Sequence, residues 1–245
     1  MIERASSLAL ALALASCGGP STEGQDQGNT GGETTVEVIR EREREAPPES
    51  GTPRDVEFPD VAQATTSSGL ALNTVQFGQL PLVYLRLVVR SGSSSDPENL
   101  PGVAELVAQM LKEGTRRRTS AQIAEAVEFL GANLDVGSDE ENVYVMIRAL
   151  ADHLGEAMEL LADIARNPRF QEAELRRLKV RELDRLRLSA QEPRYLARRA
   201  MYRELYGSHP YAEVDTNPDA IGRVSRNDLI RWHRAHVVPN NSFLV

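Results

Sequence analysis

The chain has 245 residues, of which 41% are hydrophobic, so it can bury the core of one or two domains. Its net charge of −8 argues against nonspecific binding to nucleic acid, which needs a basic surface, so we expect no nucleic-acid partner. A single cysteine, Cys17, excludes an intramolecular disulfide.

The first residues form a segment of their own. Ala5–Ala15 is an apolar run that is too short to span a membrane permanently. It ends in Leu14-Ala15-Ser16-Cys17, which resembles the lipobox of bacterial lipoproteins, where the thiol takes the lipid. We expect residues 1–17 to be a lipoprotein signal peptide with lipidation at Cys17, although an ordinary secretory signal with a stray cysteine is the alternative. Gly18 follows, which by the same resemblance points to the outer membrane, facing the periplasm of the bacterial cell envelope.

Residues 18–57 have almost no apolar side chains to bury. They are rich in Gly, Ser, Thr, Pro, Glu and Arg, and the charges alternate in sign from Glu41 to Glu45. This composition predicts a flexible linker with at most a short helical patch. The folded domain is then expected at residues 58–245.

Strand patterns open the folded part. A hairpin is expected from residues 63–66 and 70–75, with Ser67-Ser68-Gly69 at its turn. Apolar and polar residues alternate over 83–90 and again over 143–148, which is typical of strands with one buried face.

Helical patterns are more numerous than strand patterns. Residues 101–113 carry one apolar stripe, with Pro101 suited to the first turn and Gly114 to a left-handed cap. The mixture of strands and paired helices indicates an α+β fold, with one antiparallel-rich sheet and helices packed on one face. Further helices are expected at 119–131, 154–164, 175–186 and 195–205, and after the capping box of Ser225 and Asp228.

Residues 101–115 resemble the zinc helix of the pitrilysin/insulinase peptidases, relatives of the mitochondrial processing peptidase. Those enzymes carry His-x-x-Glu-His before an ending of the form Met/Leu-x-x-Gly-Thr. Here Glu105 and Gln109 stand at the two His positions and Ala108 at the Glu position, while Gly114-Thr115 is kept. Two imidazoles would bind zinc and the Glu would act as the general base, so the substitutions remove both functions.

The third ligand of the family, a Glu on a later helix, is also replaced. An ungapped count from Gln109 at the family's spacing reaches Arg185, whose guanidinium stays protonated and repels a divalent cation. Asp184 lies one position earlier, and we interpret it as a solvated helix carboxylate. A shift of one residue would instead make Glu105, Gln109 and Asp184 an alternative metal site of oxygen donors.

Other segments extend the resemblance from about residue 60 to the end. Ser91–Pro97 is similar to the family's loop before the zinc helix, and Tyr206–Tyr211 is similar to its Tyr-Gly-x-His-Pro-Tyr loop. The resemblance implies one pitrilysin-type half-unit, the peptidase-like N-terminal domain. Because the chain stops within a strand pattern at Ser242–Val245, we expect this domain to be truncated at its C-terminal end.

Together these features predict a catalytically inactive member of the family without a bound cofactor. The resemblance implies that it is the partner or scaffold subunit of an envelope peptidase, in a hetero-oligomer with an active family member. One alternative is an active zinc metallopeptidase with divergent ligands. Another is a stand-alone envelope lipoprotein that binds peptides or unfolded protein segments in its cleft and at its sheet edge.

A contact should replace the lost metal site. If the ungapped count is right, Glu105 and Arg185 stand at two former ligand positions, so the backbone should bring their side chains together. We expect an ion pair between them, with Gln109 beside it, that links the two helices. Its net stabilisation should be small, about 0–1 kcal/mol in a wet cleft.

Overall fold

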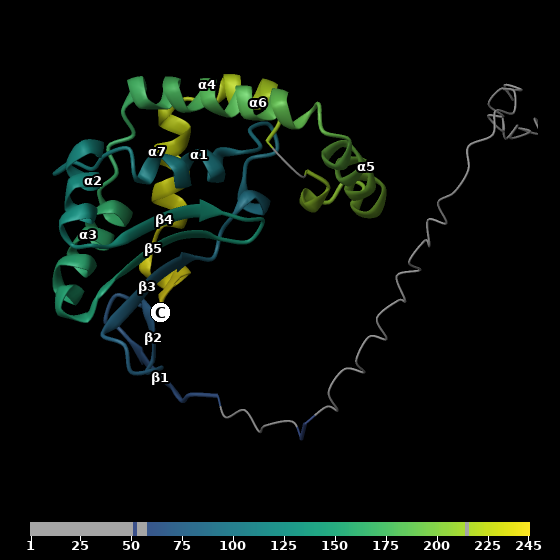
Figure 1. Cartoon of the computed structure of the whole chain (residues 1–245). Helices are drawn as coiled ribbons and strands as arrows, with labels where there is room; N and C mark the ends of the chain where they lie inside the picture. The colour runs from purple at the N-terminus through teal and green to yellow at the C-terminus, as the bar shows by residue number, and fades with distance from the viewer. Residues whose placement is uncertain (1–50, 53–57, 214–215) are drawn as a thin grey trace, which may run out of the picture. The chain divides into compact units, whose positions relative to one another are not determined.

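The structure, a computed structural model, describes residues 51–52, 58–213 and 216–245 (Figure 1). The predicted signal peptide with Cys17 and nearly all of the predicted linker lie outside the described residues. The strands and helices all belong to one compact unit, Asp55–Val245. No helix of the described residues combines the length and the apolar character that a membrane span requires.

A six-stranded sheet forms one layer of this unit, with the strand order β1-β2-β6-β3-β5-β4. Neighbouring strands are antiparallel except β2 and β6, which are parallel. The antiparallel-rich sheet that the sequence predicts is therefore confirmed. The strands are β1 (Val61–Thr65), β2 (Ala71–Val75), β3 (Leu82–Val89), β4 (Asn133–Ser138), β5 (Val143–Leu150) and β6 (Ser242–Leu244).

The alternating pattern predicts which side of the central strands is buried. In β5, Val143, Val145 and Ile147 are buried, whereas Tyr144 and Met146 between them are only half-buried. The buried side chains belong to the main hydrophobic core, which they share with residues of the helices. Because successive side chains of a strand point to opposite faces, this alternation places the apolar side chains on the one face of the sheet that meets the helices.

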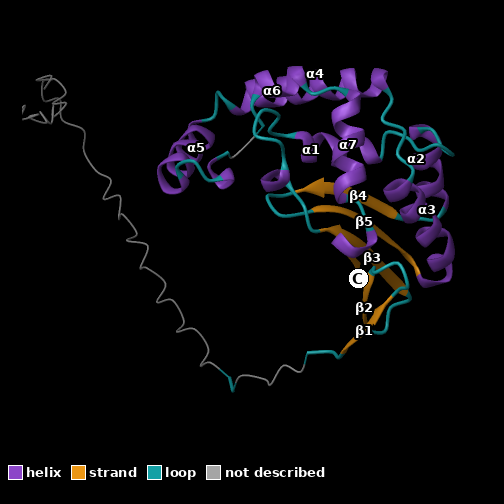
Figure 2. Ribbon diagram, turned by 180° about the vertical axis from the view of Figure 1, so that it is seen from behind, coloured by secondary structure: helices purple, strands orange, loops and turns teal. Residues whose placement is uncertain are grey.

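The helices cover one face of the sheet, as predicted. Figures 1 and 2 show α1, α3 and α7 next to the sheet, with α4 lying across α1 and α7 on the side away from the strands. The fold is that of the predicted half-unit. In the described residues the helices are α1 (Val103–Leu111), α2 (Ser120–Phe129), α3 (Leu154–Arg166), α4 (Glu172–Ser189), α5 (Pro193–Tyr206), α6 (Pro218–Arg223) and α7 (Arg226–His236).

α1 lies at the centre of the helical layer, in contact with the sheet, α4 and α7. All five side chains of its predicted apolar stripe are buried. Each is at most 1% exposed: Val103, Leu106, Val107, Met110 and Leu111. Burying one side chain of this size stabilises the folded chain by about 1.5–3 kcal/mol relative to leaving it in water. Packing in the core therefore fixes the position of α1.

The first turn of α1 differs from the prediction. The helix begins at Val103, so Pro101 precedes it, and Gly102 takes a left-handed conformation with φ +96°. The carboxylate of Asp96 causes this start, because it accepts hydrogen bonds from the backbone N–H groups of Gly102 at 2.6 Å and Ala104 at 2.8 Å. At the other end, Gly114 is left-handed as predicted, with φ +127°.

Two other helices begin with capping boxes, and the sequence predicted the one formed by Ser225 and Asp228. Thr119 and Gln122 exchange side-chain and backbone hydrogen bonds at the start of α2, and Ser225 and Asp228 do so at the start of α7. Such reciprocal bonds satisfy two N–H groups that a helix leaves without partners.

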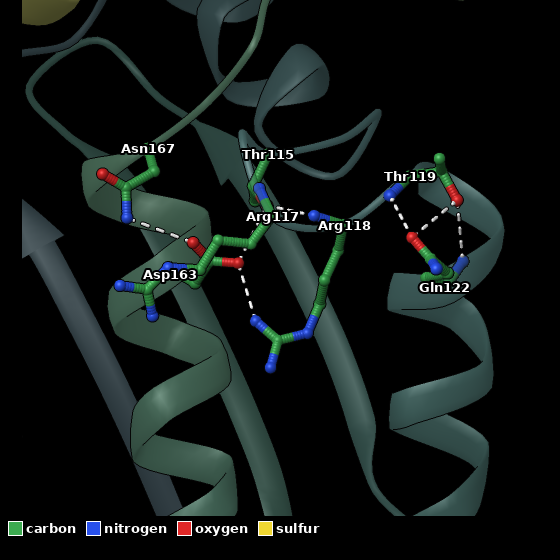
Figure 3. Close-up of polar contacts among 7 residues, drawn as sticks. All are labelled: Thr115, Arg117, Arg118, Thr119, Gln122, Asp163 and Asn167. Atoms are coloured by element: carbon green, nitrogen blue, oxygen red, sulfur yellow. Dashed lines mark hydrogen bonds and ion pairs between the residues drawn. The ribbon is translucent and has the colours of Figure 1, made fainter.

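The Gly114-Thr115 ending of the α1 segment leads into a polar cluster, which we call the Thr115 anchor: the buried Thr115 and Asp163 with the half-buried Arg118 and Asn167 (Figure 3). Asp163 on α3 accepts hydrogen bonds from the hydroxyl of Thr115 at 2.8 Å, from Arg118 at 2.7 Å and from the Asn167 amide at 3.1 Å. Burial alone would raise the pKa of Asp163, but these donors hold it below its usual value. The anchor ties the end of α1 to α3.

Candidate functional site

A cavity of about 700 Å³ lies beside the first turns of α1. Its walls come from the loop before α1, from the end of β4 with the loop after it, from Arg185 on α4 and from the segment 207–213. It contains Glu105, the residue at the first lost zinc-ligand position. We call this the α1 cavity.

The carboxylate of Glu105 is held by two uncharged donors. The hydroxyl of Ser138, at the end of β4, donates to Oε2 at 2.6 Å, and the amide of Gln109 donates to Oε1 at 3.0 Å. Gln109 therefore lies beside Glu105, as expected. Both residues are half-buried.

Ala108 is fully buried between these positions, with 0% exposure. Its methyl group packs in the core cluster with the apolar residues of α1. At the position of the family's general base, the helix thus offers neither an acceptor for a proton nor access to water.

The predicted ion pair between Glu105 and Arg185 is wrong: it is not among the ion pairs of the described residues. Arg185 does line the α1 cavity with Glu105, but its guanidinium donates to Glu182, at 2.9 Å from Nε and 2.5 Å from Nη2. Glu182 is three residues earlier on the same helix, so it reaches the guanidinium without any help from the tertiary fold. Both carboxylate oxygens of Glu105 already have donors.

A different ion pair links the two helical segments. Arg181 on α4 contacts Glu113, just beyond the end of α1, at 3.1 Å. This ion pair involves neither Glu105 nor Arg185, so it is not the predicted contact.

Asp184 does not join Glu105 and Gln109. It is exposed and pairs with Arg187 at 2.8 Å on α4, as a solvated helix carboxylate would. Arg185, and not Asp184, lines the α1 cavity, in agreement with the ungapped count. In the part of the chain that the structure describes, no three His, Cys, Asp or Glu side chains are grouped to hold a metal ion.

Asp96 is a residue of this cavity that the sequence alone did not single out. Burial raises its pKa to about 6, although the backbone N–H groups of Ala104 and Gly102 lower it. Its place in the Ser91–Pro97 loop, just before the helix, was the available signal. Its contacts span six and eight residues, too far for a local capping pattern to reveal.

Gly207–Pro210, from the Tyr206–Tyr211 segment, form another wall of the α1 cavity. His209 Nδ1 accepts a hydrogen bond from the backbone N–H of Tyr211 at 3.2 Å, and the Tyr211 hydroxyl donates to Glu141 in the β4–β5 connection. The histidine of this motif therefore caps a short turn (Pro210–Ala212).

The α1 cavity is mainly acidic. Among the residues that line this cavity, Arg185 is the one arginine, there is no lysine, and His209 is the one histidine. The carboxylates that line it are those of Asp96, Glu98, Glu105, Asp139, Glu140 and Glu213.

Comparisons with known proteins agree with this geometry. Residues 79–219, more than half of the chain, match the family model described as Insulinase (Peptidase family M16). A Helicobacter pylori protein named Non-peptidase homolog YmxG is 27% identical over 151 residues, which are 61% of this chain and 35% of that protein. A Rickettsia bellii protein named as an uncharacterized zinc protease is 22% identical over 178 residues, 72% of this chain and 43% of that protein.

A solved structure gives the same result. The peptidase M16 inactive domain from Pseudomonas fluorescens is 31% identical with a TM-score of 0.72, over 76% of this chain and 45% of that one. The chain spans less than half the length of each of these three relatives. The match over residues 79–219, on a half-unit fold with a substituted zinc helix, shows that the chain belongs to the insulinase family, peptidase family M16.

Proposed function

We propose that this chain is a catalytically inactive M16 protein that serves as the partner or scaffold subunit of an envelope peptidase. The observation that carries the proposal is Ala108, a fully buried methyl group at the position of the general base. Without a base on this helix face, a bound water could not be activated for attack on a peptide bond.

The other substituted positions do not fit a catalytic zinc ion. Zinc needs three good donors and one open position, and Gln109 offers a neutral amide that already donates to Glu105. Arg185 adds a positive charge to the same cavity. We therefore propose that no zinc cofactor is bound, which separates this chain from the alternative of an active peptidase with divergent ligands.

Two of the relatives support the inactive reading. The Helicobacter pylori protein carries the name non-peptidase homolog, and the Pseudomonas fluorescens structure is described as an inactive domain. In this family, inactive members pair with active ones, so an active M16 protein is the proposed partner. The chain's half-unit fold leaves the remaining parts of a complete peptidase to such a partner or to further sequence.

A second candidate function is the binding of extended peptides. β4 is the last strand of the sheet and pairs with β5 alone among the described strands. Ser138 at its end lines the α1 cavity and donates to Glu105. An extended peptide or unfolded segment could add to such an edge through backbone hydrogen bonds.

Metal content and cleavage test the main proposal. We expect the purified 245-residue chain to hold far less than one zinc per molecule and to cleave no unfolded peptide at a rate that a chelator changes. Stoichiometric zinc together with chelator-sensitive cleavage would contradict it. Affinity capture from the native envelope separates the two roles, because a partner subunit should bring down an M16 protein with an intact His-x-x-Glu-His motif.

The proposed location is the bacterial outer membrane, with lipid attached at Cys17. Its support is the sequence Leu14-Ala15-Ser16-Cys17, which lies outside the described residues. The variant Cys17→Ser should move the protein from the membrane fraction to the soluble fraction. If the variant stays in the membrane fraction like the unaltered chain, the lipid anchor is wrong.

A further inference from the structure

A second cavity, of about 500 Å³, lies among the end of α3, the loop that follows it, the loop after α1, and α7. Five of its lining residues are arginines, and none is acidic. We call it the arginine pocket, and its arginines are Arg116, Arg166, Arg169, Arg226 and Arg234.

The charges of the arginine pocket are not balanced nearby. Within the described part of the chain, none of its five arginines forms an ion pair, whereas Arg118, Arg177 and Arg187 each have an acidic partner. The whole chain carries a net charge of −8, so this concentration of positive charge runs against its composition. Like charges around one hollow repel each other, and a bound anion would relieve that repulsion.

Hydrogen bonds to backbone carbonyls hold three of these arginines in place, two through their backbone N–H groups and Arg226 through its side chain. The N–H of Arg116 donates to the carbonyl of Asn167 at 2.9 Å, and the N–H of Arg169 donates to the carbonyl of Gly114 at 3.0 Å. Arg226 Nε donates to the carbonyl of Phe170 at 2.7 Å. A ligand would therefore meet arginines whose backbones are already in place, which lowers the cost of ordering the site.

Phe170 lines the arginine pocket at a turn with an unfavourable backbone conformation. Phe170 has φ +47°, the one left-handed residue other than glycine in the described part of the chain, and it is only 3% exposed. Its ring meets the edge of His233, 5.6 Å away between centroids. Burial lowers the pKa of His233, whose Nε2–H donates to the carbonyl of Ala165, and this ring forms part of the pocket's wall.

We propose that the arginine pocket binds a phosphate-bearing ligand that carries more than one negative charge. Guanidinium groups match phosphate oxygens with pairs of parallel hydrogen bonds. A single carboxylate would balance only one of the five positive charges, whereas a di- or triphosphate balances several. The phosphate comes either from a soluble phosphorylated molecule or from a phospholipid headgroup.

Titration of the full chain with inorganic triphosphate by calorimetry tests this proposal. We expect saturable binding of one triphosphate per chain that weakens as salt is raised. The double variant Arg116→Gln/Arg234→Gln removes two exposed arginines from the pocket and should weaken binding about tenfold or more, as expected for charge-assisted hydrogen bonds. The matched control Arg177→Gln/Arg187→Gln removes the same charge from α4 and should leave binding unchanged.

The controls define what overturns the proposal. Equal loss of binding in both double variants, at unchanged thermal stability, would reduce the effect to net charge, and absence of saturation would exclude a site. Polyglutamate that binds as tightly as triphosphate would exclude phosphate chemistry.

Vesicles distinguish the two phosphate sources. Phosphatidylcholine vesicles are compared with and without phosphatidic acid, whose phosphomonoester headgroup can carry two negative charges, using the unaltered chain and the Arg116→Gln/Arg234→Gln variant. A gain from phosphatidic acid that this variant loses supports a lipid headgroup. Triphosphate binding without such a gain supports a soluble ligand.

Discussion

The two ends of α1 hold polar residues of the same kinds in different surroundings. At the C-terminal end, Asp163 of the Thr115 anchor is 3% exposed and receives donors on both oxygens. Beside the first turns, Glu105 also receives donors on both oxygens, but it is half-buried and borders the α1 cavity. The Gly-Thr ending that the family shares lies at the buried end, and the substituted zinc positions lie at the open end.

This difference separates residues that the fold requires from residues that only chemistry requires. Removing the carboxylate of Asp163 would leave the buried hydroxyl of Thr115 without its acceptor, a cost to the fold that has nothing to do with catalysis. Replacing the His, Glu and His of the zinc motif removes a reaction but leaves the packing of α1 in place. A family can therefore lose its activity while the frame of its site persists.

The largest effect is expected from Asp163→Asn. The new amide presents a donor where a carboxylate oxygen now accepts from Thr115, Arg118 or Asn167, and it removes the charge that pairs with Arg118, so at least one donor of the cluster faces another donor. We expect the free energy of unfolding to fall by about 2–4 kcal/mol, measured by urea denaturation. A loss below about 0.5 kcal/mol would show that the two ends of α1 are equivalent.

A pH dependence of comparable size should come from Asp96 at the other end. The pKa of Asp96 is raised from 3.8 to about 6 by burial, so between these values the folded chain binds more protons than the unfolded chain. The free energy of unfolding should therefore fall as pH rises from 4 to 6, by about 2–3 kcal/mol from this group.

The contribution of Asp163 to stability depends on pH with the opposite sign and in a more acidic pH range. Its pKa is lowered, so its contribution is present above the unfolded pKa near 3.8 and is lost only as the solution becomes more acidic.

Urea unfolding at pH 4, 5, 6 and 7 should show the Asp96 slope in the unaltered chain and not in Asp96→Asn. The same slope in both proteins would assign it to another group.

Much of this architecture could be predicted from local patterns. The strands other than β4, the apolar stripe of α1 and the capping box of Ser225 and Asp228 depend on residues at fixed short spacings, and they were found. The strand β4 and the capping box at the start of α2 were not predicted. The start of α1 was missed because Asp96 acts across six to eight residues. The Glu105–Arg185 pair was wrong because Glu182, a neighbour on α4, competes for the same guanidinium.

The arginine pocket could not be predicted at all. Its arginines lie between positions 116 and 234, on segments that only the folded chain brings together. No spacing rule connects such positions, whereas the zinc positions on one helix are visible as a motif.

A smaller effect is expected from Gly102→Ala, at the start of α1. Gly102 has φ +96°, and an added Cβ would lie 1.9 Å from the Thr216 side chain, so we expect a loss of about 1–2 kcal/mol. Gly155→Ala on α3 is the matched control, because its Cβ would meet nothing within 4 Å and should be neutral or slightly stabilising. Thermal unfolding of the two variants compares them. Equal midpoints would show that the left-handed start is not required.

The smallest effect should come from Glu105→Gln, the counterpart of Asp163→Asn at the open end. The amide again replaces one acceptor by a donor, but the hydroxyl of Ser138 can rotate and accept where it now donates. Glu105 is half-buried beside a cavity, so water can satisfy what remains. We expect a change of about 0–1 kcal/mol by the same urea measurement. A loss as large as that of Asp163→Asn would mean that Glu105 has taken over a structural role from the lost metal site, and the distinction between the two ends of α1 would fail.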